Sequence, residues 1–329
     1  MKNKIRINPI LKKEMVVGSR SMKMSWAIMA VSAILTAIVV FTLLVSQLNV
    51  ASGATYDYST LIVLFPVLGI AECIMLSLMV PVITSGSISG EREKQTLDIM
   101  LTTPISPFSI VLGKLMSAMM IVMMYMIASV PVMAITFVLG GLSWWNLIGL
   151  FIILIYLGIY VGSVGIFCSS VVKKSIAATI LTIVIGLAII IGTSLIYSVS
   201  ITIMSMYYMT SGNMRPDSLL GPVVVFMFNP YSPIFDFMVR ALSDSSIYDM
   251  VSSANINPVM GFLYRFWIPI SMGINLLISF GFLKLAAARV GNVKTKKAGK
   301  VNNKAGNKAV QNTATTNNTV TENTDNQNN

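Results

Sequence analysis

The stretch LIVLFPVLGIAECIMLSLMVPVITSGSISGEREK, residues 61–94, decides the fold of this chain. Its first part, Leu61–Ile83, is apolar apart from Ser77 and the carboxyl of Glu72. A helix needs roughly 20 apolar residues to cross the hydrocarbon core of a bilayer. The stretch therefore predicts a transmembrane helix that is followed directly by a charged segment.

The whole composition agrees with a membrane protein. Hydrophobic residues make up 55% of the 329 residues and charged residues 11%, whereas an ordinary soluble domain carries about 25% charged residues. Apolar runs long enough to cross occur six times, and they predict an all-α integral membrane protein with six transmembrane helices. The expected helices are 26–48, 61–83, 112–139, 147–170, 175–200 and 264–285.

The positions of lysine and arginine predict the orientation. With six spans, all but three of the 23 basic residues fall on one side of the membrane. The three exceptions are Arg215, Arg240 and Arg265. Basic residues are retained on the inner face, so both termini are expected in the cytoplasm, in a multi-pass protein of the cell membrane. A bacterial plasma membrane is the expected location.

Segments outside the six spans have distinct compositions. Residues 1–25 form a basic leader, in which apolar and lysine positions suit an amphipathic helix on the inner leaflet. Residues 289–329 are rich in Lys and then in Asn and Thr, which predicts a disordered cytoplasmic tail. Nucleic-acid binding is not expected, since no aromatic residues are interleaved with the lysines. The lipid bilayer is therefore the expected partner of both ends.

The segment 201–260 is expected outside the cell or partly re-entrant. Within it, Ser218–Phe235 is uncharged but contains three prolines. If this stretch crossed the membrane, the lysine-rich C-terminus would lie outside, against the charge rule. Prolines also interrupt the helical hydrogen bonds that a lipid-exposed span needs.

Local pattern predicts a short cytoplasmic helix within the segment 85–110. Gly90 suits an N-cap, and Glu91 and Glu93 would then lie in the first turn, where carboxylates favour the positive helix end. Glu91 and Lys94 are three residues apart and are expected to pair on the surface.

The same helix is expected to end soon afterwards. Leu97 and Met100 fall on one apolar face, and Pro104 stops the helix. Ser106 and Pro107 begin the helix that enters the third span. A short, charged helix that connects directly to two spans would suit the transmission of force from a soluble partner to the membrane domain.

The pattern ISGEREKQTLDIMLTTPIS, followed by IVLGK, resembles the permease subunits of ABC-2 type transporters. The resemblance is most specific over Ile88–Lys114, extends to Asn229-Pro230, and covers the six-span layout through Ala288. It implies a pairing with a second permease, in a homo- or heterodimer whose interface carries the substrate, and an export function. It further implies that separate ATP-binding cassette ATPase subunits dock on the cytoplasmic loop and leader. We expect Glu91, Arg92, Glu93 and Lys94 to make this coupling contact, with Leu97 and Met100 packing the helix that carries them.

The residue types in this chain limit the reactions that it could catalyse and the ligands that it could bind. Gly113-Lys114 lacks the preceding glycine and following hydroxyl of a phosphate-binding loop, so ATP is expected to bind in a partner and no cofactor is expected here. The chain has no histidine, which excludes a Ser-His hydrolase and a His-ligated metalloprotease. No catalytic residue and no metal ligand is therefore predicted, and the chain is not expected to be an enzyme.

Glu72 is the candidate intramembrane polar group. A charge near the middle of a span is costly, so Glu72 is expected to face a polar pathway or a dimer interface, or to bond a neighbouring helix. Its partner would be a hydroxyl, a backbone carbonyl or a group on another subunit. Two alternatives to an ATPase-driven permease remain at this stage: an ion-coupled secondary transporter that uses Glu72, and a non-transporting membrane anchor or sensor.

Small residues recur at helical spacing in the fourth span. Gly158, Gly162 and Gly165 would let a neighbouring helix approach closely. They are therefore predicted to be a helix-packing stripe and not a ligand site.

Overall fold

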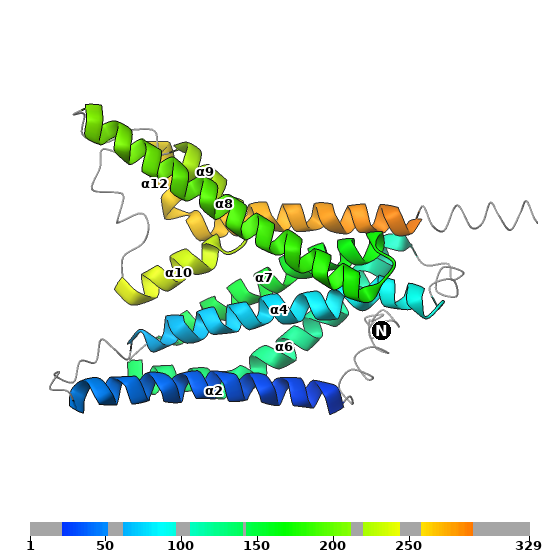
Figure 1. The fold of residues 1–329 in the computed structure, drawn as a ribbon, viewed down its shortest axis with the longest axis horizontal. Coiled ribbons are helices and arrows are strands. Elements are labelled where there is room, and N and C mark those ends of the chain that lie inside the picture. Colours follow the sequence, from blue (N-terminus) through cyan, green and yellow to red (C-terminus); the bar gives the residue numbers. More distant parts are fainter. Residues whose placement is uncertain are drawn as a thin grey trace, which may run out of the picture.

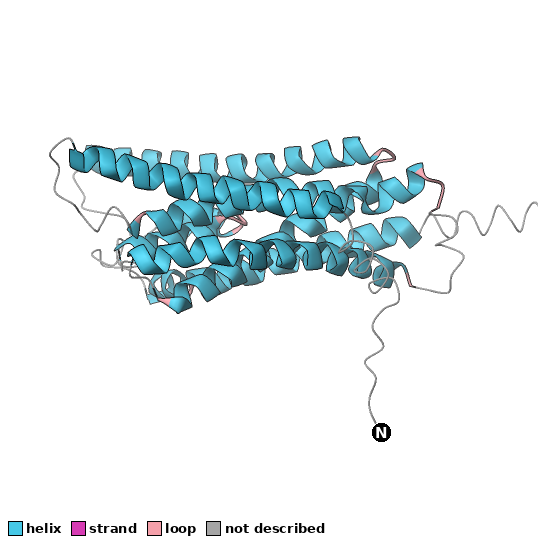
Figure 2. Cartoon of the chain, turned by 90° about the horizontal axis from the view of Figure 1, so that it is seen from below, coloured by secondary structure: helices cyan, strands magenta, loops and turns pink. Residues whose placement is uncertain are grey.

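The computed structural model describes residues 22–51, 62–96, 106–140, 143–211, 220–243 and 258–291 of the chain. All regular secondary structure in these ranges is helical (Figure 1, Figure 2). The helices are α2 (Met22–Ala51), α4 (Leu64–Glu93), α6 (Pro107–Gly140), α7 (Trp144–Val171), α8 (Ser175–Ser211), α9 (Leu220–Met227), α10 (Ser232–Ser243), α12 (Pro258–Arg265) and a helix at Trp267–Gly291, called the 267–291 helix below.

Six of the described helices are long and apolar enough to cross a membrane: α2, α4, α6, α7, α8 and the 267–291 helix. This confirms the predicted multi-pass membrane protein with six spans. The six helices run along the length of the molecule, and α9, α10 and α12 gather toward one end (Figure 1). Most of the predicted leader (1–21) and almost all of the predicted tail (292–329) lie outside the described residues.

The second spanning helix is longer than the sequence predicts. α4 continues ten residues beyond Ile83 and ends at Glu93, so Gly90 lies inside a helix and is not an N-cap. The apolar run ends at Ile83, but Ser85 and Ser89 are fully buried in the part of α4 that contacts α7 and α8. Tertiary packing therefore sustains the helix past the point where hydropathy falls.

α7 lies at the centre of the bundle and packs against α4, α6 and α8. Three of its glycines face these neighbours. A Cβ added at Gly158 would lie 3.1 Å from Met119 of α6, and one at Gly162 would lie 2.8 Å from Leu115. Gly165 meets α4 in the same way. The absence of side chains at these three positions lets α4 and α6 approach α7 closely.

The segment that contains the three prolines folds into two short helices. α9 has 8 residues and α10 has 12, so neither reaches across a core that needs roughly 20. The turn between them meets the spanning helices. Tyr156 of α7 donates its hydroxyl to the carbonyl of Pro230 at 3.3 Å, and Tyr231 donates to Ser77 Oγ of α4 at 2.7 Å.

The Asn-Pro pair explains why the chain turns here. Asn229 Oδ1 accepts the backbone N–H of Tyr231 at 2.9 Å, which is the pattern of an Asx turn, and its amide donates to Ser194 Oγ of α8 at 3.2 Å. The carbonyl of Met227 at the end of α9 accepts a hydrogen bond from Ser271 Oγ at 2.9 Å. Polar groups that the turn frees from helical bonding are thus satisfied by neighbouring helices.

Candidate functional site

A common type of helix C-terminus ends α4. Lys94 is the C-cap, and Gln95 has a φ of 57°. The N–H of Gln95 bonds the carbonyl of Arg92 at 3.2 Å, and that of Thr96 bonds the carbonyl of Glu91 at 2.9 Å. These two bonds and the left-handed residue between them form a Schellman motif. The motif fixes the direction in which the chain leaves α4.

Gln95 occupies a position that usually takes glycine. A left-handed conformation costs a residue with a Cβ about 1–2 kcal/mol, and Gln95 is exposed. We therefore expect Gln95→Gly to leave the melting temperature of the purified protein unchanged or to raise it. Gln95→Val, with a branched Cβ, should lower it. A fall of the same size for both variants would contradict this reading of the turn.

Arg92 of α4 reaches the end of α7. Its guanidinium donates to the carbonyl oxygens of Ser170 at 3.3 Å and Val172 at 3.4 Å. The last carbonyls of a helix have no partner within the helix and carry a partial negative charge. Arg92 therefore caps α7 with a positive charge at the end that favours one.

Glu93, the next residue, reaches the start of α8. Its carboxylate accepts the backbone N–H of Ser175 at 3.1 Å and the Ser175 hydroxyl at 2.8 Å. A carboxylate is favoured at a helix N-terminus because the first N–H groups are unpaired. Consecutive residues of α4 thus bind both sides of the turn that joins α7 to α8.

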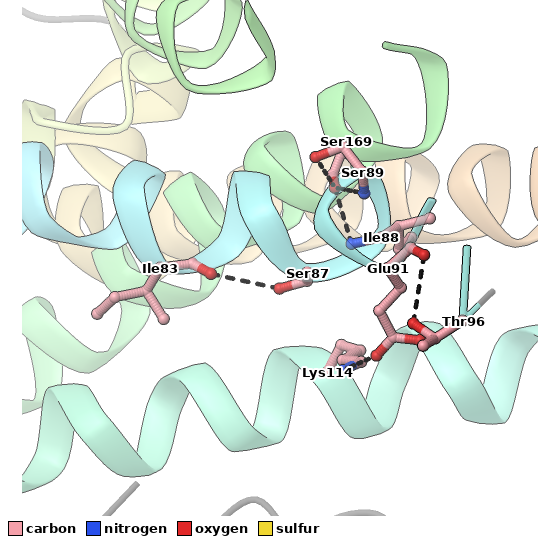
Figure 3. A network of polar contacts seen from close by, with 8 residues as sticks. All are labelled: Ile83, Ser87, Ile88, Ser89, Glu91, Thr96, Lys114 and Ser169. Atoms are coloured by element: carbon pink, nitrogen blue, oxygen red, sulfur yellow. Dashed lines mark hydrogen bonds and ion pairs between the residues drawn. The ribbon is translucent and has the colours of Figure 1, made fainter. Parts of the chain in front are cut away.

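Glu91 binds α6. Its Oε1 lies 2.7 Å from Lys114 Nζ, and the two side chains are 25% and 10% exposed (Figure 3). The sequence predicted a pair between Glu91 and Lys94 instead, and this is wrong. Lys94 is the exposed C-cap residue, whereas Lys114 lies one helix away and comes within reach because α4 and α6 pack side by side.

Hydroxyl groups join α4 to α7 just before these charges. Ser169 Oγ accepts the backbone N–H groups of Ile88 and Ser89, both at 2.9 Å (Figure 3). Ser85 Oγ lies 2.5 Å from Thr179 Oγ1 of α8. We call this whole set of contacts, made by residues 85–93 of α4 with α6, α7 and α8, the α4 junction.

The α4 junction contains three of the six residues predicted for coupling. Glu91, Arg92 and Glu93 are each bonded within the chain, and Lys94 is exposed beside them. Leu97 and Met100 lie outside the described residues. The sequence did not reveal Lys114, Ser169 or Ser175 as partners, although Ser175 directly follows two lysines at a break between apolar runs, which is a signal for a helix start.

Glu72 lies in the same helix, well away from the α4 junction. Its side chain is 0% exposed, and Ser129 Oγ of α6 lies 2.5 Å from its Oε1. A hydroxyl was one of the three kinds of partner that the sequence left open. Because Glu72 is buried inside the single chain, it is not on the surface against which a second copy could pack.

Comparison with known families agrees with this architecture. The profile of the family described as ABC-2 family transporter protein matches residues 81–277, which begin within α4, include the α4 junction and end within the 267–291 helix. A comparison with curated proteins finds no match. The matched domain is a membrane permease that lacks an ATPase site. By this match over more than half of its length, the chain belongs to the ABC-2 family of transporter membrane proteins.

Proposed function

We propose that this chain is the permease subunit of an ABC-2 exporter, that it forms the translocation pathway with a second permease, and that separate ATP-binding cassette ATPases drive it. Family membership supports the class of transporter. The observation that carries the coupling role is the α4 junction, where three consecutive residues bind three different helices. ATP binds in the partner, and this chain contributes no cofactor site.

Charge supports a cytoplasmic location for the α4 junction. Lys94 follows α4 directly, Lys114 pairs with Glu91, and Lys173 and Lys174 lie in the turn between α7 and α8 that Arg92 and Glu93 bind. Arg289 lies two residues before Gly291, whose backbone lies beside Pro107 at the start of α6. In inner-membrane proteins the loops on the cytoplasmic side carry an excess of lysine and arginine. We infer that both termini lie on this side as well, and that the membrane is a bacterial plasma membrane.

The geometry suggests how a docked ATPase would move the permease helices. A displacement of the end of α4 would be transmitted to α6 through Glu91, to α7 through Arg92 and to α8 through Glu93. These three residues would act as transmitters inside the permease. Lys94, which is exposed, would make the direct contact with the ATPase, and Leu97 and Met100 would pack the segment that follows.

A charge reversal at Lys94 tests the proposal. The tagged full-length chain would be co-expressed, one at a time, with the ATP-binding cassette ATPases of its source genome and purified. We expect one ATPase to co-purify with the wild type, and at least a tenfold smaller amount to co-purify with Lys94→Glu, about 1.4 kcal/mol. Glutamine at the same position should give an intermediate yield.

The matched control is Lys284→Glu, a reversal of an exposed lysine on the 267–291 helix. It should leave the yield of the complex unchanged. If no ATPase co-purifies with the wild type, an ATPase-driven permease is the wrong function and a membrane anchor or sensor becomes the better reading. If the complex forms but Lys94→Glu does not weaken it, the contact lies elsewhere.

A further inference from the structure

Glu72 is buried with only half of its carboxyl group bonded. The side chain is 0% exposed, between α4 and α6. Oε1 contacts Ser129 Oγ, whereas Oε2 is buried and has no hydrogen-bond partner among the described residues. A buried carboxylate is strongly disfavoured unless it is paired and fully hydrogen-bonded. The site therefore does not meet the needs of a charged carboxylate.

The hydrogen atoms at Ser129 decide which form of Glu72 fits. Ser129 Oγ lies 2.5 Å from Glu72 Oε1 and 2.8 Å from the carbonyl oxygen of Met126. A serine hydroxyl has one hydrogen to donate, and a carbonyl oxygen has none. If Ser129 donates to Met126, as serines in helices commonly do, the hydrogen between Ser129 and Glu72 must come from the carboxyl. Both short contacts are then hydrogen bonds only when Glu72 carries a proton.

The neighbouring ionisable groups do not offset a negative charge. Cys73 follows Glu72 in α4, and Tyr125 lies one helical turn before Ser129 in α6. Neither a thiol nor a phenol carries a positive charge in either of its protonation states. α10, which also packs on α4, carries Asp236 and Arg240, which pair with each other. Three further described helices that pack on α4, namely α2, α7 and α8, are almost free of charged residues. α7 and α8 have no charged residue in their described spans, and α2 has only Lys23.

Cations on the two helices themselves are distant. Arg92 lies 20 residues further along α4, or roughly 30 Å at 1.5 Å per residue. Lys114 precedes Ser129 by 15 residues on α6, or roughly 22 Å. Both are already bonded in the α4 junction.

We propose that Glu72 is a proton-binding site. In this conformation its carboxyl group holds one proton and donates it to Ser129 Oγ, and Ser129 donates in turn to the carbonyl of Met126. The bound proton joins α4 to α6 within the membrane. Separation of the two helices at this level would remove the acceptor and expose the carboxyl, so the proton is held as long as the helices stay in contact. This site does not depend on the identity of the ATPase or of the cargo.

Infrared spectroscopy of the full-length protein tests the proposal directly. At neutral pH we expect the wild type to show the C=O stretch of a protonated carboxylic acid. Uniform isotope labelling of glutamate should shift this band, and labelling of aspartate should not. The band should be absent from Glu72→Gln, which keeps the shape and a hydrogen-bond donor but cannot be protonated in the same way. Glu322→Gln, in the polar stretch near the C-terminal end of the sequence, is the matched control and should retain the band.

Ser129→Ala adds a test of the donor direction. With its acceptor removed, the carboxyl should keep its proton, and its C=O band should move to higher frequency. A wild-type spectrum without a glutamate-derived carboxylic acid band would overturn the proposal, and this outcome does not require any variant to fold. A band that persists in Glu72→Gln would also overturn it, because the protonated group would then be another glutamate.

Discussion

Gly165→Ala is expected to prevent normal accumulation of the folded protein. An added Cβ would overlap Thr84 Oγ1 of α4 and lie 3.1 Å from Thr84 Cβ. Thr84 is fully buried and its hydroxyl donates to the carbonyl of Val80 at 2.8 Å, and a β-branched side chain has few rotamers to escape into. Extra volume in a well-packed core typically costs 1–3 kcal/mol, and here α4 and α7 would have to move apart. The yield of monodisperse protein and its melting temperature measure the effect.

Two further variants make this prediction specific. Gly186→Ala, in α8, adds a Cβ that meets nothing within 4 Å, and alanine is favoured over glycine in a helix by about 1 kcal/mol. We expect this control to be at least as stable as the wild type. Thr84→Ala combined with Gly165→Ala should recover part of the loss, because it removes the overlapping oxygen. Equal stability of the two glycine variants would show that α7 does not pack on α4 as described.

Reversal of one charge in the Glu91–Lys114 pair is expected to be the second largest effect. In Glu91→Lys, two ammonium groups would face each other where the carboxylate now lies 2.7 Å from Lys114 Nζ. Breaking a buried ion pair costs about 3–5 kcal/mol, but Glu91 is 25% exposed and solvent screens part of the charge, so about 2 kcal/mol is a better expectation. Lys114→Glu should do the same. The melting temperature of the purified chain measures both.

The exchanged pair separates charge pairing from other causes. Glu91→Lys combined with Lys114→Glu should regain most of the lost stability. Lys94→Glu is the control within the same turn, since its side chain is exposed. At the C-cap of α4 it should cost the chain alone at most about 1 kcal/mol, less than either reversal in the pair, while it weakens ATPase binding. If the exchanged pair is no more stable than either single variant, the ion pair does not stabilise the α4 junction.

The spanning helices could be predicted from the sequence because a single physical requirement defines them. Each needs a long apolar run, and such runs are rare outside membranes. The end of α4 could not be predicted by the same signal. Gly90 followed by Glu91 and Glu93 is typical of a helix start, yet the helix continues through these residues. The buried hydroxyl of Ser169 in α7 holds α4 in place by accepting the backbone N–H of Ser89. The hydropathy of the α4 sequence contains no information about this contact.

The partners in the α4 junction are also set by packing. Lys114 is 23 residues from Glu91, and Ser175 is 82 residues from Glu93. Spacing along the sequence predicts only nearby partners, such as Lys94. It contains no information about which other helices pack against α4. The choice of Glu91, Arg92 and Glu93 as residues that matter rests on the family resemblance, and their coupling role stays a prediction. For Glu72, the sequence limited the partner to a few kinds of group, and the structure shows the hydroxyl of Ser129.

Cross-linking from position 94 tests the central claim most directly. A photoreactive amino acid would replace Lys94 in the full-length chain, co-expressed with the ATPase that co-purifies with it. The control position is Val184 of α8, which is 53% exposed on an apolar helix. We predict a covalent product between permease and ATPase from position 94 and none from position 184. An ATPase that co-purifies but never cross-links to position 94 would contradict the proposal that it drives this permease through the end of α4.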